Sequence, residues 1–259
     1  MRVKKISIIV VCLITRVSFI KTIESIRSQI NQNYEIIVID GGSIDGTVKE
    51  IIKMKSFFSF YSIKKDNGIY DAMNKGIDQI QSDWAMFLNS GDIFFDNRVL
   101  DRLINSKMPQ SDIIFSNTVV KNDNLKYVVP SKQFNNNTIT MPFCHQSTIV
   151  KTSLLKYHKF NVDYKFSSDF DFFLKCYKQN KIFFYFDNIL STVESGGISD
   201  NQRQKVYKEN LRILNKARPS LLIYMLMLRQ FLVSLVKFFV PIKLLKFILK
   251  LKYKNKIIK

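Results

Sequence analysis

The sequence predicts an α/β protein with a doubly wound, parallel sheet. A β-branched run at residues 6–11 reads as a buried strand, a helix-periodic segment follows it, and residues 35–39 form a second short apolar strand. Two such strands joined by a helix form a βαβ unit, the usual building block of a parallel sheet. The alternation continues through further segments, which indicates a nucleotide-binding layout with ligands at the carboxyl ends of the strands.

The first strand has to be distinguished from a secretory signal. Arg2, Lys4 and Lys5 precede an apolar run, as in a charged leader. No small-residue cleavage site follows, however, and Arg16 interrupts the sequence soon after. We therefore expect a buried strand rather than a signal peptide.

The later elements follow from periodicity. Apolar residues recur at steps of three and four, which predicts a helix with one apolar face, at Val17, Ile20, Ile23, Ile26 and Ile30. Further helices are expected at 47–54 and 70–80, and a strand at 84–88. Beyond about residue 110 the pattern is less regular, with short apolar runs between polar, Asn-rich segments that read as loops.

The formal charge of +19 belongs mainly to the end of the chain. From Arg203 to Lys259 there are 15 Lys or Arg against one acid, Glu209, so this segment carries +14 and the remaining 202 residues carry only +5. The three cysteines, at positions 12, 144 and 176, are odd in number and widely spaced, which fits neither a disulfide framework nor a metal knuckle. A reducing, cytoplasmic environment is expected.

Two acids stand directly after predicted strands, where open α/β sheets bind ligands. Asp40 follows the strand at 35–39, and Asp92 lies just past the strand at 84–88. A lone Asp before two glycines more often serves a turn. The second acid in the equivalent place favours a ligand site, with a sugar or base on one side and a metal on the other.

Several segments then resemble, in order, the motifs of the family 2 glycosyltransferases, which have the GT-A fold. They are residues 36–47 (IIVIDGGSIDGT), 66–76 (DNGIYDAMNKG), 87–92 (FLNSGD), 168–171 (SDFD) and 196–199 (GGIS). The resemblance spans roughly residues 5 to 215 and is closest to the branch that builds bacterial capsule, O-antigen and exopolysaccharide chains. It implies an α/β/α sandwich and an inverting, hexosyltransferase-like enzyme.

By that resemblance the donor is a nucleotide-sugar, with uridine as the expected base. Asp40 would accept a hydrogen bond from the base, and Asp92 would be the metal-binding end of the family's D-x-D motif. Asn89 and Gly91 stand where acids often do, so the donor diphosphate and water would complete the coordination. Mn²⁺ or Mg²⁺ fits such a site, since Mg²⁺ is typically held by one or two carboxylates plus substrate phosphates.

Asp169 resembles the family's catalytic base, which would take the proton of the acceptor hydroxyl. Ser168 stands where the family often has a first acid, so Asp169 would act alone. The alternative is that Asp169 only caps the helix that follows, and both roles are compatible.

Two weaker sites also follow from the resemblance. His145 and Gln146 match a position on the acceptor side, although a histidine taken alone in such a place is more often a structural residue. Asp66 and Gly68 match donor-binding positions, with Gly68 letting the backbone approach the donor, but a plain turn explains both nearly as well.

The C-terminal segment is rich in Leu, Ile, Phe and Lys. Its longest uncharged run, 219–228, has ten residues, well short of the ~20 that span a bilayer. After Pro241, helical spacing would place four lysines on one side of a helix: Lys243, Lys246, Lys250 and Lys254. Another side of the same helix would be apolar, with Leu244, Leu245, Ile248 and Leu251. We expect a glycosyltransferase domain at 1–218 and a basic amphipathic tail at 219–259 that lies on anionic lipid. The alternative is a tail packed on protein.

The enzyme is thus expected at the inner face of the cell membrane, as a peripheral protein acting on a saccharide or polyprenyl-linked acceptor. A dinucleotide oxidoreductase would need G-x-G-x-x-G after the first strand, but residues 12–16 contain no glycine. A sugar nucleotidyltransferase would usually show a Gly- and Arg-rich loop there. A non-enzymatic, basic membrane-binding protein stays open; a nucleic-acid partner is not expected, because the basic residues of the tail alternate with bulky aliphatics.

Overall fold

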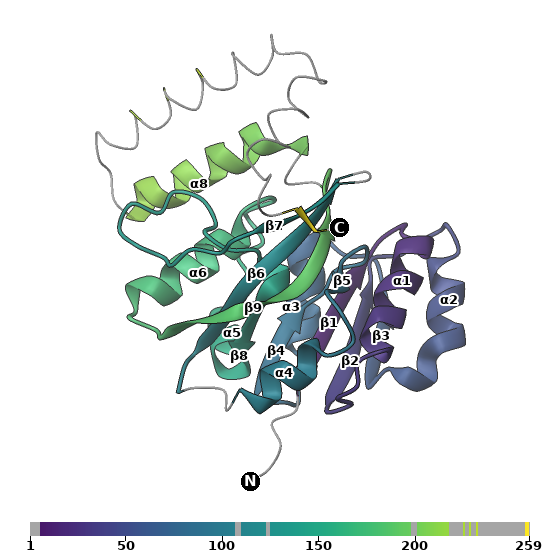
Figure 1. Ribbon diagram of the computed structural model, residues 1–259. Helices are drawn as coiled ribbons and strands as arrows, with labels where there is room; N and C mark the ends of the chain where they lie inside the picture. The colour runs from purple at the N-terminus through teal and green to yellow at the C-terminus, as the bar shows by residue number, and fades with distance from the viewer. Residues whose placement is uncertain are drawn as a thin grey trace.

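In the computed structural model, the first strands of the chain form the centre of a mixed sheet (Figure 1). The structure describes residues 6–106, 110–122, 125–197 and 201–217, together with 225, 228, 232, 257 and 258. The central strands run parallel to one another and are β1 (Ile6–Cys12), β2 (Tyr34–Asp40), β3 (Phe60–Ile63) and β4 (Trp84–Phe87). The predicted βαβ unit is confirmed, with the first strand buried along its whole length.

The second half of the sheet is mixed rather than parallel. β8 (Thr148–Lys151) runs antiparallel to β4, and β6 (Ile113–Asn122) runs antiparallel to β8. The other strands are β5 (Ile93–Phe94), β7 (Leu125–Val129), β9 (Phe183–Glu194) and β10 (Ile257–Ile258). β9 runs parallel to β6 and antiparallel to β5, and it pairs with both. Because β8 is antiparallel to β4, the start of β8 lies at the carboxyl end of β4, which matters for the site.

Helices cover both faces of the sheet. One face carries α1 (Arg16–Arg27), α2 (Thr47–Met54) and α4 (Val99–Asn105); the other carries α3 (Ile69–Ile77), α5 (Thr152–His158), α6 (Ser168–Lys178) and α8 (Arg203–Ala217). Ile8 and Val10 of β1 belong to the core under the first set of helices, whereas Ile9 and Val11 belong to the core under the second. This alternation follows from the two-residue period of a strand, and it produces the expected α/β/α sandwich.

The first helix forms where predicted, but its apolar face differs. The buried residues of α1 are Phe19, Thr22, Ile23 and Ile26. Val17 and Ile30 are 65% and 55% exposed. Ile30 lies beyond the end of the helix, and Val17 is two residues before Phe19 and therefore on another face.

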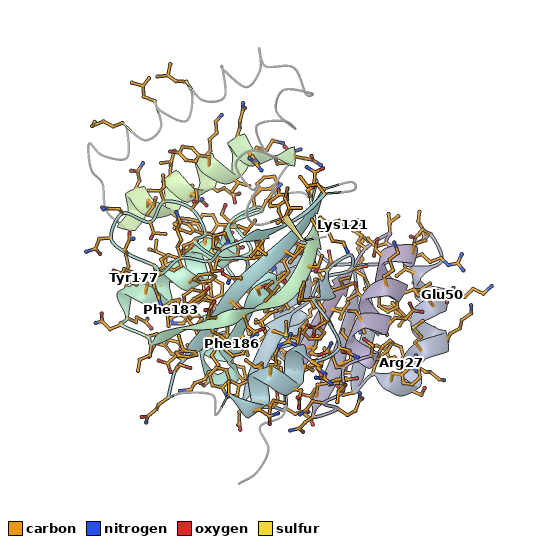
Figure 2. The ribbon with its side chains drawn as sticks, viewed as in Figure 1. Arg27, Glu50, Lys121, Tyr177, Phe183 and Phe186 are labelled. Atoms are coloured by element: carbon orange, nitrogen blue, oxygen red, sulfur yellow. The ribbon has the colours of Figure 1, made fainter. Side chains whose placement is uncertain are left out.

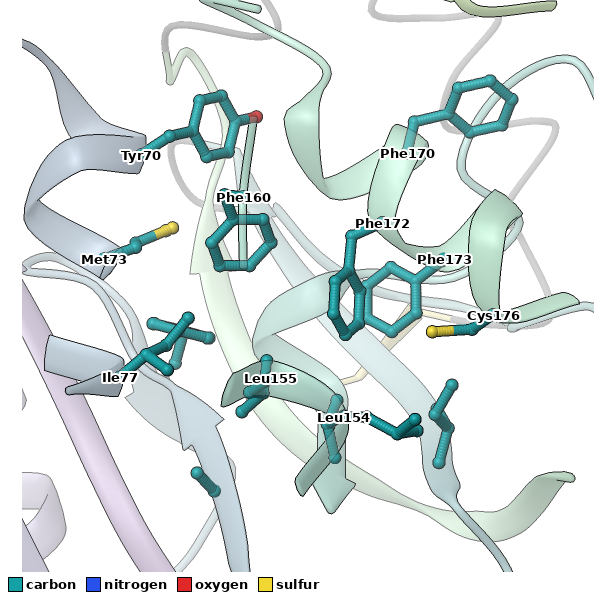
Figure 3. Packing of buried hydrophobic residues seen from close by; sticks show 14 of the residues in the cluster. Tyr70, Met73, Ile77, Leu154, Leu155, Phe160, Phe170, Phe172, Phe173 and Cys176 are labelled. Atoms are coloured by element: carbon teal, nitrogen blue, oxygen red, sulfur yellow. The ribbon is translucent and has the colours of Figure 1, made fainter. Parts of the chain in front are cut away.

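Aromatic side chains build much of the core between α3, α5 and α6 (Figure 3). The ring of Phe160 lies 5.5 Å from that of Tyr70 and 5.5 Å from that of Phe172. On β9, Phe183 packs against this core and Phe186 against the core on the other face (Figure 2). The residues that lead into α6 are therefore anchored in a dense aromatic core.

The tail at 219–259 lies almost entirely outside the described residues, so the predicted amphipathic helix and the predicted domain boundary stay predictions. Two short 3₁₀ turns complete the described elements, η1 (Lys55–Phe57) and η2 (His145–Ser147). Within the described part of the chain, no helix combines the length and apolarity that a membrane crossing needs.

Candidate active site

The residues named from the sequence gather at the carboxyl end of the parallel strands. Asp40 ends β2 and pairs with Cys12 at the end of β1. The structure brings the candidates together in two groups. The first comprises Asp40, Asp66 and Gly68, and the second comprises Asp92, His145, Gln146 and Asp169.

Asp40 is fully buried, and its carboxylate holds the loop that follows β2. Oδ1 accepts hydrogen bonds from the amides of Gly42 and Ser43, at 3.0 and 2.8 Å. Oδ2 accepts the Ser43 hydroxyl at 2.5 Å, and the same hydroxyl oxygen accepts the Ile14 amide at 2.8 Å. Asp40 thus organises the loops after β1 and β2 together, and this turn role was the alternative that the sequence left open.

Asp66 approaches the same loop from the segment before α3. Its Oδ1 accepts the amide of Gly68 at 2.9 Å, and a Cβ atom at Gly41 would lie only 2.4 Å from its Oδ2. Glycine at position 41 therefore makes room for a carboxylate. Gly68 has a φ of +123° and an exposed backbone, a conformation that favours glycine. Burial raises the pKa of the Cys12 thiol, and the negative charges of Asp40, Asp45 and Asp66 raise it further.

Asp92 is 9% exposed, and burial raises its pKa to about 7. The positive charge of His145 and a hydrogen bond from Gln146 act in the opposite direction, while Glu194 adds to the rise. Thr22 of α1 fixes the surrounding turn, since its hydroxyl donates to the Asp92 carbonyl at 2.8 Å and accepts the Gly91 amide at 3.0 Å. Burying a carboxylate is costly, and a bound cation would offset that cost.

Asp169 lies in the first turn of α6 and contacts side chains from two other elements. Its Oδ1 accepts the Tyr70 hydroxyl of α3 at 3.1 Å, and its Oδ2 lies 3.3 Å from Nδ1 of His145 on η2. Oδ1 also accepts the amide of Phe170, the next residue, at 2.9 Å. The expected capping role is not found, because α6 already begins at Ser168 and its N-cap is Ser167. Burial, followed by the nearby Asp169 charge, raises the pKa of Tyr70 well above its usual range, which keeps the phenol a hydrogen-bond donor.

His145 also faces the D-x-D position. Its Nε2 lies 3.5 Å from the side-chain nitrogen of Asn89. Gln146 is fixed in turn by Cys144, whose thiol donates to its Oε1 at 2.7 Å. The turn η2, directly before β8, therefore supplies neighbours to both Asp92 and Asp169.

The side chains around Asp92 provide only some of the ligands that a divalent cation needs. Within the described residues no cluster of three or more His, Cys, Asp or Glu side chains could hold a metal. Beside Asp92, however, the described part of the chain leaves the buried Asn89 Oδ1 and Ser90 Oγ without hydrogen-bond partners. One carboxylate with such neutral oxygens suits Mg²⁺ or Mn²⁺ when substrate phosphates complete the shell.

The sequence alone indicated no role for four residues that hydrogen-bond to the site or to the segment before α6, namely Thr22, Tyr70, Asn74 and Glu209. Tyr70 and Asn74 lie inside the segment 66–76, but its resemblance named only Asp66 and Gly68. Thr22 looks like an ordinary helix residue. Glu209 is the one acid between Arg203 and Lys259. A single acid in such a basic segment is a signal that could have pointed to it, but it entered the sequence analysis only in the charge count.

The parallel strands β1 to β4, with acidic residues at their carboxyl ends, have the layout of a nucleotide-binding α/β fold. Residues 7–182 match the model of Glycosyl transferase family 2, which covers more than half of the chain. The protein belongs to this family and is a glycosyltransferase.

Known relatives agree with this assignment. A PGL/p-HBAD biosynthesis glycosyltransferase of Mycobacterium bovis is 24% identical over 206 residues, which cover 73% of this chain and 77% of that protein. Staphylococcus aureus TarS 1–349 in complex with UDP-GlcNAc has a similar fold, with a TM-score of 0.61 and 20% sequence identity. The match covers 81% of this chain and 65% of the TarS chain, so this chain spans less than two thirds of TarS 1–349. Glucosyl-3-phosphoglycerate synthase of Mycobacterium tuberculosis, in complex with Mn²⁺, UDP and glucosyl-3-phosphoglycerate, has a TM-score of 0.59 and 12% identity over 82% of this chain and 79% of that one.

Proposed function

We propose that this protein is a metal-dependent, inverting glycosyltransferase that moves a sugar from a UDP-linked donor to a saccharide or polyprenyl-linked acceptor. One observation carries the proposal: two buried or half-buried carboxylates on separate elements, Asp92 and Asp169, both meet the turn His145–Ser147. The similar structures of TarS and of glucosyl-3-phosphoglycerate synthase hold UDP-GlcNAc and UDP with Mn²⁺, which supports the choice of donor and cation.

In this mechanism Asp169 is the general base. Its carboxylate takes the proton of the acceptor hydroxyl as the hydroxyl oxygen attacks the anomeric carbon and the bond to the nucleoside diphosphate breaks. His145 and Tyr70 donate to opposite oxygens of Asp169 and orient the carboxylate toward the acceptor. The Tyr70 phenol stays protonated, because its pKa is raised by burial.

On the donor side, Asp92 with Asn89 would hold Mn²⁺ or Mg²⁺ next to the diphosphate. A cation there would offset the negative charge that develops on the departing nucleoside diphosphate. Asp66 and Gly68 are proposed donor contacts, since both lie at the edge of the loop that Asp40 organises. Asp40, whose carboxylate is buried, would then act on the base mainly through the shape of that loop.

We further propose that the enzyme works in surface-polysaccharide synthesis at the cytoplasmic face of the membrane, held there by the basic tail at 219–259. The support is the charge pattern, with +14 after position 202. A membrane-bound acceptor would be presented at the same surface.

A panel of nucleotide-sugars tests the proposal. Purified protein is incubated with UDP-, GDP- and dTDP-sugars, with and without Mn²⁺, and the released nucleotide is identified. We expect nucleoside diphosphate from a UDP-sugar, dependent on the cation. In a second incubation the protein is given a nucleoside triphosphate and a sugar phosphate. Release of pyrophosphate there would instead indicate a nucleotidyltransferase.

A further inference from the structure

Helix α8 lies beyond the residues that match the family model, yet it contacts the segment that carries the proposed base (Figure 1). The carboxylate of Glu209 accepts two backbone hydrogen bonds from this segment. Its Oε1 accepts the Lys165 amide at 2.9 Å and its Oε2 accepts the Phe166 amide at 2.8 Å. One residue further on, the Ser167 hydroxyl donates to the Val206 carbonyl of α8 at 3.2 Å. These contacts end two residues before Asp169.

The chemistry of position 209 is specific to a carboxylate. Two neighbouring amides point at one side chain, and only an ionised carboxylate offers an acceptor oxygen to each without bringing a donor of its own. Hydrogen bonds to a charged acceptor are also stronger than neutral ones. α8 also packs through Leu211, Ile213 and Leu214, which are buried in the core that includes α6. Two cation–π contacts, from Lys205 to the Phe166 ring and from Arg212 to the Tyr164 ring, add to the contact.

The other end of the same segment is held by α3. Asn74 makes a reciprocal pair with Phe160, in which its Nδ2 donates to the Phe160 carbonyl and its Oδ1 accepts the Phe160 amide, both at 2.8 Å. α3 also supplies Tyr70, which donates to Asp169. Residues 160–167 are therefore fixed by Asn74 at one end and by Glu209 at the other, and α6 begins directly after them.

We propose that Glu209 is a positioning residue for Asp169. By holding the amides of residues 165 and 166, it sets where α6 starts and hence where the carboxylate of Asp169 meets the acceptor hydroxyl. This inference rests on the proposed role of Asp169 as the base. It makes catalysis depend on a helix outside residues 7–182, the part of the chain that matches the family model.

The first experiment compares Glu209→Gln with Lys208→Gln, a neighbouring exposed residue of the same helix. The assay follows UDP release from the UDP-sugar selected by the panel, together with the Kd of UDP in Mn²⁺ by calorimetry. For Glu209→Gln we expect kcat to fall about 10- to 100-fold, the cost of a small misplacement, while the donor KM and the UDP Kd stay within about twofold. Lys208→Gln should match the wild type in all three.

Hydrogen exchange gives a readout that does not depend on activity. Peptides that contain residues 165 and 166 should exchange faster in Glu209→Gln, and Glu209→Asp should restore part of both the protection and kcat. A variant that loses UDP binding and kcat in equal measure would show a general structural role and would overturn the proposal.

A double-mutant cycle with Asp169→Asn separates this inference from the proposed function. If Glu209 acts through Asp169, adding Glu209→Gln to Asp169→Asn costs little further activity, because the base is already lost. If the two losses in activity are fully additive, the positioning role of Glu209 is wrong. It is also wrong if Glu209→Gln keeps the wild-type kcat while Asp169→Asn loses most of it. In both cases the assignment of Asp169 as the base would stand. Near-normal activity in Asp169→Asn would contradict the base assignment itself.

Discussion

Nδ1 of His145 lies 3.3 Å from Oδ2 of Asp169. The same ring faces Asn89 through Nε2, and its charge lowers the pKa of the buried Asp92. The imidazole therefore links the acid proposed to hold the cation with the carboxylate proposed to act as base. Because the two steps of transfer, departure of the diphosphate and deprotonation of the acceptor, have to coincide, a shared neighbour is mechanistically useful.

Replacing His145 with Asn should reduce kcat more than donor binding. The carboxylate of Asp169 would lose a donor that orients it, and we expect a loss of about 10- to 100-fold in kcat. The Kd for UDP and Mn²⁺ should be nearly unchanged when it is measured well above the pKa of Asp92, where this acid is ionised in both proteins. His158→Asn is the matched control, since His158 lies on α5 and bonds to Gln179 instead. Equal activity in the two variants would remove His145 from the mechanism.

Cation binding should depend on pH through Asp92. Its pKa of about 7 means that the folded, metal-free protein holds a proton at Asp92 below that pH. A cation has to displace this proton, so the affinity for Mn²⁺ in the presence of UDP should rise about tenfold per pH unit up to neutrality and level off above it. Calorimetry in two buffers of different ionisation enthalpy would count the proton released.

Asp92→Asn should abolish this pH dependence together with most of the cation affinity, while the fold stays intact. An unchanged affinity for Mn²⁺ and UDP in the variant would place the cation elsewhere.

Gly41→Ala should weaken donor binding without unfolding the protein. The added methyl would lie 2.4 Å from Oδ2 of Asp66, so this carboxylate would have to turn away. A donor contact made by Asp66 would then be weakened. Gly197→Ala, where nothing lies within 4 Å of the new atom, is the control. Wild-type UDP affinity in Gly41→Ala would argue against a donor contact by Asp66.

Truncation after Arg218 should release the protein from membranes while donor hydrolysis is retained, because the proposed site residues all precede the cut. Each basic residue near anionic lipid contributes about 1 kcal/mol, so high salt should weaken, without eliminating, the binding of the full-length chain to anionic liposomes. Continued sedimentation of the truncated protein with membranes would identify the tail as a packing or oligomerisation element.

The parallel half of the fold follows from local sequence. β1 and β2 are short β-branched runs joined by one helix, and local periodicity is enough to predict their pairing. The predicted apolar face of α1 was wrong at two positions, because Val17 and Ile30 fit the helical spacing but are exposed. The mixed half was not predicted, since β6 and β9 pair across more than 60 residues and carry no local signal of register.

The candidate residues came from strand-end position and from motif order, but their contacts did not. His145 lies 24 positions before Asp169 and 53 after Asp92 in the chain, and the antiparallel return of β8 brings it to the carboxyl end of β4. The buried state of Asp40 and the docking of Glu209 depend equally on long-range packing. Neither the burial of Asp40 nor the docking of Glu209 can be predicted from the spacing of neighbouring residues in the sequence.

Asp169→Asn tests the central claim most directly. The variant keeps the size of the side chain and removes the basic carboxylate, and loss of a general base typically lowers the rate by about 10²–10⁴-fold. We predict that sugar transfer from the UDP-donor falls by that factor, while calorimetry finds the wild-type affinity for UDP and Mn²⁺. Transfer at a near wild-type rate would contradict the account.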